Sequence, residues 1–116
     1  SQRLARRLCP KCKAVVDVPK EALLEEGFIE GELDDLTIYG PVGCDACTSG
    51  YKGRVGIYQV MPISEAMGRI IMENGNSMQL ADQAKLEGIN DLRASGLNKI
   101  RFGFTSIEEI NRVTKE

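Results

Sequence analysis

Hydrophobic residues in the second half of the chain recur at the spacing of amphipathic helices. One helix is expected after Ser64, a residue type that favours the N-cap position, and a second is expected to end at Gly88. A third is expected over about 91–102, and Ser106 with Glu109 has the spacing of a capping box that opens a last short helix. The methionines on these helices are expected to fill the core. The inward positions are Met67, Ile70, Ile71, Met78, Leu80, Ala81, Ala84, Leu92, Leu97, Ile100, Phe104, Ile107, Ile110 and Val113.

The first half of the chain shows shorter elements. Residues 2–8, "QRLARRL", place leucines four positions apart, which is typical of the end of a helix. A short helix is expected from about Pro19 to Gly27, followed by a second short turn or helix over about 30–36. The β-branched and aromatic residues of 36–40 and 54–60 predict two strands.

Four cysteines form two Cys-x-x-Cys pairs, Cys9 with Cys12 and Cys44 with Cys47, separated by 31 residues. Two residues between cysteines let a tight turn direct both sulfurs at one ion, and two such turns supply four tetrahedral ligands. Thiolates select zinc, or iron in a rubredoxin-like electron carrier, and redox-active or free thiols are the other alternative. Because four cysteines leave no open position, a zinc site here is expected to be structural rather than catalytic.

Charge is distributed unevenly along the chain. Residues 21–36 hold seven acids and no base, so they are expected to form a solvated face, with a docking face for a basic partner as the alternative. Four cations near the cysteines are expected to offset the charge of the thiolates. A basic zinc ribbon that contacts nucleic acid would use similar residues. The cations are Lys11, Lys13, Lys52 and Arg54.

Several classes of function are disfavoured. The net charge of −2 argues against a nucleic-acid partner, and no apolar run approaches the roughly 20 residues of a membrane span, so a cytoplasmic protein is expected. The chain has no His, the commonest general base, and neither a G-x-x-x-x-G-K-[ST] nor a G-x-G-x-x-G loop. Asp34 and Asp35 are adjacent and point in different directions, so they form no catalytic pair. The chain is therefore not expected to be an enzyme by itself.

These elements together predict an α+β fold in two parts. Residues 1–62 are expected to form a small four-cysteine zinc-binding module with short strands, and residues 63–116 a C-terminal bundle of short helices. The first helical segment has no cap and no beginning, which indicates a fragment of a larger protein.

Four stretches carry a resemblance to a known family: "QRLARRLCPKC", "GPVGCDACTSGYKGRVGIYQVMPIS", "ADQAKLEGINDLRASGLNKI" and "GFTSIEEINRVT". Together they cover nearly the whole chain. They resemble the C-terminal part of the PilB/GspE secretion ATPase family, nearest to its type IV pilus assembly members. Gln59 stands where the family often has Glu, a minor departure. A fragment of a type II secretion ATPase is the alternative.

The resemblance implies a parent protein that is a hexameric, cytoplasmic, RecA-like ATPase, peripheral to the inner membrane, which powers pilin polymerisation. ATP and Mg would bind upstream, outside this chain. Cys9, Cys12, Cys44 and Cys47 carry over as the ligands of a structural zinc. Implied partners are the upstream RecA-like core of the same chain, neighbouring subunits of the hexamer and an inner-membrane platform protein.

Three arginines lie where, by this resemblance, the RecA-like core ends. One of them is expected to approach a neighbouring subunit or a nucleotide, and solvated helix charge is the alternative. They are Arg3, Arg6 and Arg7.

Overall fold

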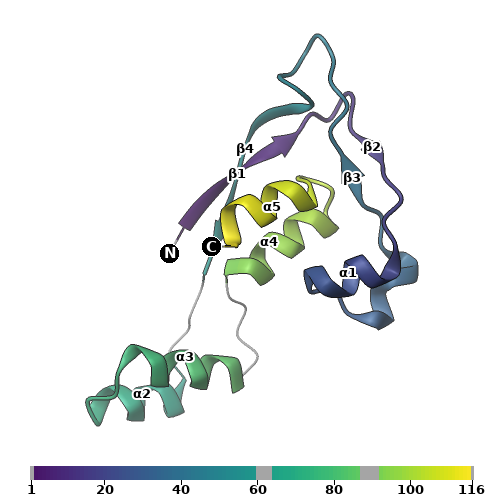
Figure 1. Cartoon of the computed structure of the whole chain (residues 1–116). Coiled ribbons are helices and arrows are strands. Elements are labelled where there is room, and N and C mark those ends of the chain that lie inside the picture. Colours follow the sequence, from purple (N-terminus) through teal and green to yellow (C-terminus); the bar gives the residue numbers. More distant parts are fainter. Residues whose placement is uncertain (1, 60–63, 87–91, 116) are drawn as a thin grey trace.

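An antiparallel ribbon and two helices that pack on it form the centre of the computed structural model, which describes residues 2–59, 64–86 and 92–115 (Figure 1). The ribbon strands are β1 (Gln2–Leu8) and β4 (Tyr51–Tyr58), and a smaller ribbon pairs β2 (Ala14–Val15) with β3 (Tyr39–Gly40). The helices are α1 (Lys20–Glu26), the 3-10 helix η1 (Glu30–Asp35), α2 (Glu65–Met72), α3 (Ser77–Leu86), α4 (Leu92–Arg101) and α5 (Ile107–Thr114).

The helix predicted for residues 2–8 is wrong, because this segment is strand β1. Its backbone pairs with β4 in a register that runs from Gln2 opposite Tyr58 to Arg6 opposite Arg54. Ala5 and Leu8 are buried while Leu4 is largely exposed, so the spacing of the two leucines did not mark a helical face. The pairing partner lies about 50 residues further along the chain, where a local pattern cannot indicate it.

The helix boundaries follow the predicted caps. Gly27 closes α1 at a φ of 120°, a conformation that residues with a Cβ rarely adopt. The Met67 N–H donates to Ser64 Oγ at 3.1 Å, and the Glu109 N–H donates to Ser106 Oγ at 3.2 Å. The reciprocal half of the predicted capping box is wrong, because the Glu109 carboxylate accepts hydrogen bonds from arginines instead.

One hydrophobic core joins residues from both halves of the chain. Leu23 and Phe28 from the first half lie in the same cluster as Leu97, Ile100 and Ile110 from α4 and α5. The boundary at residues 62 and 63 stays a prediction, but the core extends across it. The remaining core residues are Ala5, Leu33, Ile38, Ile57 and Val113.

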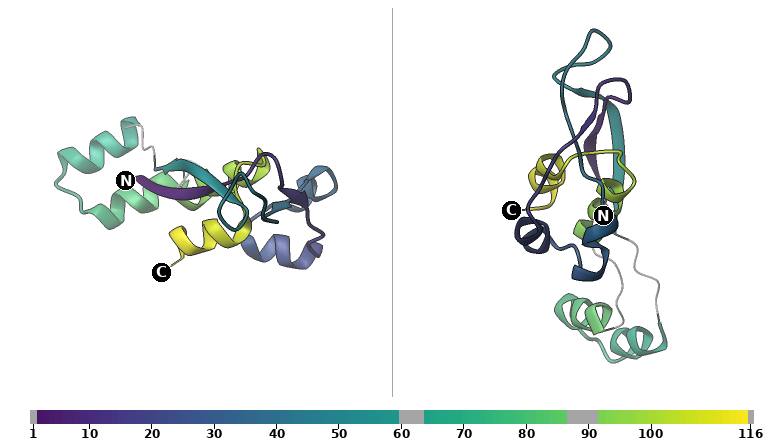
Figure 2. Two further views of the ribbon diagram at one scale, coloured as in Figure 1. Left: turned by 90° about the horizontal axis from the view of Figure 1, so that it is seen from above. Right: turned by 90° about the vertical axis from the view of Figure 1, so that its right-hand side faces the viewer.

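The C-terminal helices form two pairs instead of the expected bundle. The pair α4–α5 packs on the β1–β4 ribbon, whereas α2 and α3 pack on each other and stand apart from it in all views (Figure 2). We call residues 64–86 the hairpin and the other described residues the body. Met67 is buried as expected, but Met72 and Met78 in the hairpin are exposed, so their expected core role is wrong. The expected helix boundaries at 88 and 91 and the side chain of Ala84 lie outside what the structure describes.

The acidic segment is only partly solvated. Glu26 pairs with Arg93 at 2.7 Å, and Glu32 pairs with Arg101 at 2.6 Å, so α1 and η1 are joined to α4. For these two acids the expected solvation is therefore wrong, because their partners are arginines on a helix of the same chain. None of the described helices is both long enough and apolar enough to span a membrane.

Candidate metal centre

The two Cys-x-x-Cys turns lie between the two ribbons. Cys9 directly follows β1, and Cys44 lies in the loop that joins β3 to β4. The Cys9 N–H donates to the Gly50 carbonyl at 2.9 Å, which joins the two loops. Gly50 has a φ of 91°, and a Cβ there would lie 2.4 Å from the Cβ of Pro41, so only glycine fits this crossing.

The structure brings together all four predicted ligands. Their sulfur atoms lie within 4.8 Å of one another, with Cys9 to Cys44 at 3.8 Å, Cys12 to Cys47 at 3.7 Å and Cys44 to Cys47 at 3.7 Å. A tetrahedral zinc with Zn–S bonds of about 2.3 Å requires sulfur–sulfur distances of about 3.8 Å. All four cysteines are free thiols. The spacing therefore fits a four-thiolate metal site and excludes disulfides, whose S–S bond is about 2 Å.

Backbone donors surround the sulfur cluster. The Gly43 N–H donates to Cys12 Sγ at 3.3 Å, and the Cys44 N–H donates to Cys47 Sγ at 3.3 Å. Such hydrogen bonds stabilise thiolates and orient them towards a shared ion. Cys9 is fully buried and Cys44 is exposed, so the cluster lies at the surface with one ligand in the interior.

The thiols influence one another. Burial raises the pKa of the Cys9 thiol, but the backbone N–H groups of Lys11 and Cys12 and the neighbouring thiols outweigh it and lower the pKa to about 7. The backbone N–H of Ala46 lowers the pKa of Cys44, whereas burial and the neighbouring thiols raise it to about 11. A divalent cation would favour deprotonation of all four thiols.

Lys13 makes contacts that were not predicted, and its charge-offsetting role stays a prediction. Its Nζ donates to the Gly103 carbonyl at 2.9 Å and lies 4.4 Å from the centre of the Tyr39 ring. This lysine therefore joins the loop of the first cysteine pair to the connection between α4 and α5. The charge-offsetting role of Lys11, Lys52 and Arg54 stays a prediction.

Sequence reasoning missed an ion cluster around the buried Glu109. The Glu109 carboxylate, with 1% of its side chain exposed, contacts Arg112 on its own helix and Arg6 on β1 at 3.0 Å. Burial raises the pKa of Glu109, but hydrogen bonds from the two arginines outweigh it and lower the pKa to about 2. Nearby, the Tyr51 and Ser106 hydroxyls lie 2.6 Å apart. Had residues 2–8 been assigned as a strand, Arg6 would have been a candidate partner for a helix packed on the ribbon.

The three N-terminal arginines have different environments. Arg3 donates to the Val113 carbonyl, Arg6 pairs with Glu109, and Arg7 lies 5.3 Å from the centre of the Phe104 ring. The alternative of solvated helix charge is therefore wrong, because these residues lie on a strand and two of them bind α5. The approach of one arginine to a neighbouring subunit or nucleotide stays a prediction.

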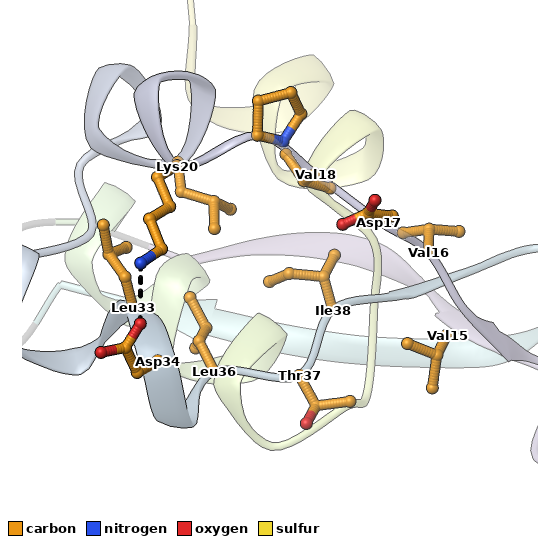
Figure 3. A pocket seen from close by; sticks show the side chains of 12 residues that line it. Val15, Val16, Asp17, Val18, Lys20, Leu33, Asp34, Leu36, Thr37 and Ile38 are labelled. Atoms are coloured by element: carbon orange, nitrogen blue, oxygen red, sulfur yellow. Dashed lines mark hydrogen bonds and ion pairs between the residues drawn. The ribbon is translucent and has the colours of Figure 1, made fainter.

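A separate cleft of about 590 Å³ opens where the β2–β3 ribbon diverges (Figure 3). Aliphatic side chains line it, among them Val16, Leu36 and Ile38, and the Lys20–Asp34 ion pair crosses it at 2.8 Å. None of the residues that line this cleft is a cysteine, so the cleft is not part of the metal site.

The fold and the four sulfur atoms define a small α+β module with a candidate structural metal centre. The family model described as Type II/IV secretion system protein matches residues 1–112. The chain is 58% identical, over its full length and 20% of the relative, to the type IV pilus assembly ATPase PilB of Pseudomonas aeruginosa. It is 34% identical to the type II secretion system ATPase E of Vibrio cholerae, over its full length and 23% of that protein.

The chain therefore belongs to the type II/IV secretion system protein family, and the resemblance found in the sequence is confirmed. It spans about a fifth of the length of these two relatives. A more distant pilus assembly ATPase, PilB of Thermus thermophilus, is 33% identical over 95% of the chain and 12% of that protein.

Proposed function

We propose that the chain is the zinc-binding, non-catalytic C-terminal region of a type IV pilus assembly ATPase. The observation that carries this is the 58% identity to such an ATPase over all 116 residues, against 34% to the type II secretion relative. The four-sulfur cluster supports the zinc, since its geometry suits a closed tetrahedral site. A region of a type II secretion ATPase is the alternative.

The role of the zinc in this proposal is structural. The ion would join the loop after β1 to the loop before β4, and so hold both ribbons in register. Structural zinc supplies on the order of 10 kcal/mol of folding free energy, comparable to the whole stability of a small domain. The body would then present a rigid surface to the rest of the protein.

The parent protein in this proposal is a hexameric ATPase at the cytoplasmic side of the inner membrane. Its RecA-like core would bind ATP and Mg and drive pilin polymerisation. The region described here would contact that core, neighbouring subunits and an inner-membrane platform protein. Nucleic acid is not among the proposed partners, in keeping with the net charge of −2.

Metal content is the first test. Elemental mass spectrometry on protein purified without metal-affinity resin, combined with a thiol titration, should find one zinc per chain and four protected thiols. Cys44→Ser should lose the zinc, and Asp45→Asn, an exposed change in the same turn, should retain it. Stoichiometric iron with a red colour would instead support an electron carrier, and four reactive thiols without metal would overturn the zinc proposal.

Complementation separates pilus assembly from type II secretion. The corresponding segment of the Pseudomonas aeruginosa PilB gene would be replaced by this chain, and surface pili would be counted. This chain should restore pili, the Vibrio cholerae segment should restore fewer, and this chain with Cys44→Ser should restore few or none. Equal restoration by the two unsubstituted segments would remove the argument for the pilus system in particular.

A further inference from the structure

The turn that joins α2 to α3 places an asparagine and a glycine side by side (Figure 1). Asn74 has a φ of 60°, in the left-handed region that glycine adopts readily and that asparagine adopts more easily than most other residues. At the next position a Cβ would lie 2.3 Å from Ile70 Cγ2 and 2.8 Å from the Ile70 carbonyl oxygen, so only glycine fits as residue 75. The backbone of the turn therefore accounts for the Asn-Gly dipeptide.

Hydrogen bonds hold this turn as the C-terminal cap of α2. The Asn74 N–H donates to the Ile71 carbonyl at 3.1 Å, and the Gly75 N–H donates to the Ile70 carbonyl at 2.7 Å. These two bonds define a Schellman motif, in which Asn74 is the left-handed residue. The backbone nitrogen of Gly75 is thus held by the helix that it closes.

The Asn74 side chain differs in its contacts from that of Asn76, two positions further on. Asn76 Oδ1 accepts a hydrogen bond from the Gln79 N–H at 2.9 Å, and Gln79 Oε1 accepts one from the Asn76 N–H at 2.8 Å. The Asn74 side chain is exposed and makes no hydrogen bond within the part of the chain that the structure describes. One asparagine is therefore held at the start of α3, whereas the amide of the other can approach the backbone.

An Asn-Gly dipeptide can react with itself. The glycine nitrogen forms a bond to the asparagine Cγ, the bond from Cγ to Nδ2 breaks, and Nδ2 leaves as ammonia with the proton that the glycine nitrogen releases. Water then opens the resulting succinimide at either carbonyl, which gives aspartate or isoaspartate. Glycine favours the attack because no side chain hinders its nitrogen. Water is the co-reactant, and no electrons are transferred.

The closed turn opposes this attack. The Gly75 nitrogen donates its hydrogen bond to Ile70, so that bond must break before the nitrogen can turn towards Asn74 Cγ. Opening of the turn can be a local event, because α2 and α3 pack chiefly on each other. The rate of deamidation would therefore follow the fraction of molecules in which the turn is open.

We propose that Asn74 is a site of spontaneous deamidation, that opening of the α2 cap controls its rate, and that its products loosen the hairpin. Isoaspartate inserts an additional carbon atom into the backbone before Gly75, whose N–H then no longer reaches Ile70. Aspartate keeps the backbone but adds a negative charge beside Glu73 at the C-terminus of α2, where the helix dipole disfavours it. The proposal does not rest on the proposed function.

Peptide mapping by mass spectrometry of the full-length protein, incubated at neutral pH, tests the site. Deamidation is expected at Asn74 and not at Asn76, at least about tenfold more slowly than at Asn74 of the same protein unfolded in urea. Met67→Ala, which removes a buried side chain of α2, should raise the rate at Asn74 at least about tenfold. Ser64→Ala, which removes only the N-cap of the same helix, should raise it less. The matched Met72→Ala, at an exposed position, should leave it unchanged.

Hydrogen exchange on the same samples measures the consequence for the hairpin. After incubation, the deamidated wild type should have lost protection in α2 and α3. Asn74→Gly keeps a residue that suits the left-handed cap but removes the reactive amide, so this variant should keep its protection after the same incubation.

Other outcomes would overturn the proposal. Absence of deamidation at Asn74 in the urea-unfolded protein would show that the dipeptide is unreactive. Equal rates in the wild type and Met67→Ala would show that opening of the hairpin does not control the reaction. Unchanged protection in the deamidated protein would show that the products do not loosen the hairpin. Metal content and pilus counts are separate measurements, so a failure of the proposed function would be recognised independently.

Discussion

Ile110 in the body and Met72 in the hairpin are both aliphatic side chains on eight-residue helices, but their environments are opposite. Ile110 is fully buried, and a Cβ on Gly96 would lie only 2.7 Å from its Cγ2 atom. Met72 leaves 83% of its surface exposed. Both helices begin with a serine N-cap, so local signals produced the same element in each region. The difference shows that a local cap signal can mark where a helix begins, whereas burial of its apolar face depends on whether another element covers it.

In the body, several contacts hold strands, loops and helices against one another, so that they cover each other's apolar faces. The sulfur cluster joins the two ribbons, Lys13 joins the first cysteine loop to Gly103, and Glu109 joins β1 to α5. In the hairpin, α2 and α3 pack chiefly on each other. Perturbations should therefore spread through the body and remain local in the hairpin.

Removal of the proposed metal should have the largest effect. Chelation, or Cys44→Ser, should cost on the order of 10 kcal/mol and unfold the body, including α4 and α5, because those helices share a core with its first half. Hydrogen exchange should show loss of protection in β1, β4, α4 and α5 and little change in α2 and α3. Position in the chain alone would predict that all helices after residue 64 persist, so continued protection of α4 and α5 would contradict the shared core.

Truncation of one side chain in each region is the next most informative comparison. Ile110→Ala should lower the free energy of unfolding by about 3 kcal/mol, because it opens a cavity between α4, α5 and the ribbon. Met72→Ala should change it by less than about 0.5 kcal/mol. Urea unfolding of the zinc-loaded protein measures both. Equal effects would mean that the hairpin contributes to the core as much as the body does.

Acidification should reveal the Glu109 cluster. Its folded-state pKa of about 2 lies below the unfolded value of about 4.3. The stabilisation is therefore fully present above about pH 4.3, and about 3 kcal/mol is lost as the pH falls towards 2. Glu109→Gln should remove this pH dependence, and the exposed neighbour change Glu108→Gln should leave it in place. The measurement is the difference in unfolding free energy between the wild type and Glu109→Gln, from urea unfolding at each pH below 6 at which the zinc stays bound. A difference that does not shrink as the pH falls would contradict the prediction.

The smallest expected difference in stability is the one between alanine substitutions of the two N-cap serines. Ser64→Ala should cost about 1 kcal/mol, the usual value of a helix cap. Ser106→Ala should cost about 2 kcal/mol, because it also leaves the buried Tyr51 hydroxyl without its partner at 2.6 Å. Thermal unfolding of both variants measures the difference. Ser49→Ala is not a suitable control, because Ser49 has a positive φ. A larger cost at Ser64 would reverse the comparison between the two regions.

Local signals in the sequence were sufficient for much of the fold. The predicted α1 and η1 lie where expected, and the caps at Ser64, Gly27 and Ser106 formed. The four cysteines, predicted from spacing alone, meet in space because two tight turns and two ribbons close around them. In each of these cases the determining atoms lie within a few residues of one another or carry a distinctive chemistry.

Errors arose where the determining partner is distant in sequence. Residues 2–8 form a strand because β4 pairs with them. The Glu109 carboxylate does not complete the capping box because it accepts a hydrogen bond from Arg6 instead. Acids at 26 and 32 were expected in solvent but are paired by arginines about 67 to 69 positions away. No periodicity within a window of a dozen residues contains that information.

The distance between Arg6 and Glu109 along the chain, 103 residues, also sets an order of events during synthesis. A ribosome adds about 5–20 residues per second, so Cys9 and Cys12 would emerge a few seconds before Cys44 and Cys47. During that interval the first pair has no partner sulfurs, and β1 has neither its pairing strand nor its ion cluster. β1 is thus the earliest described element to be made and among the last to be completed.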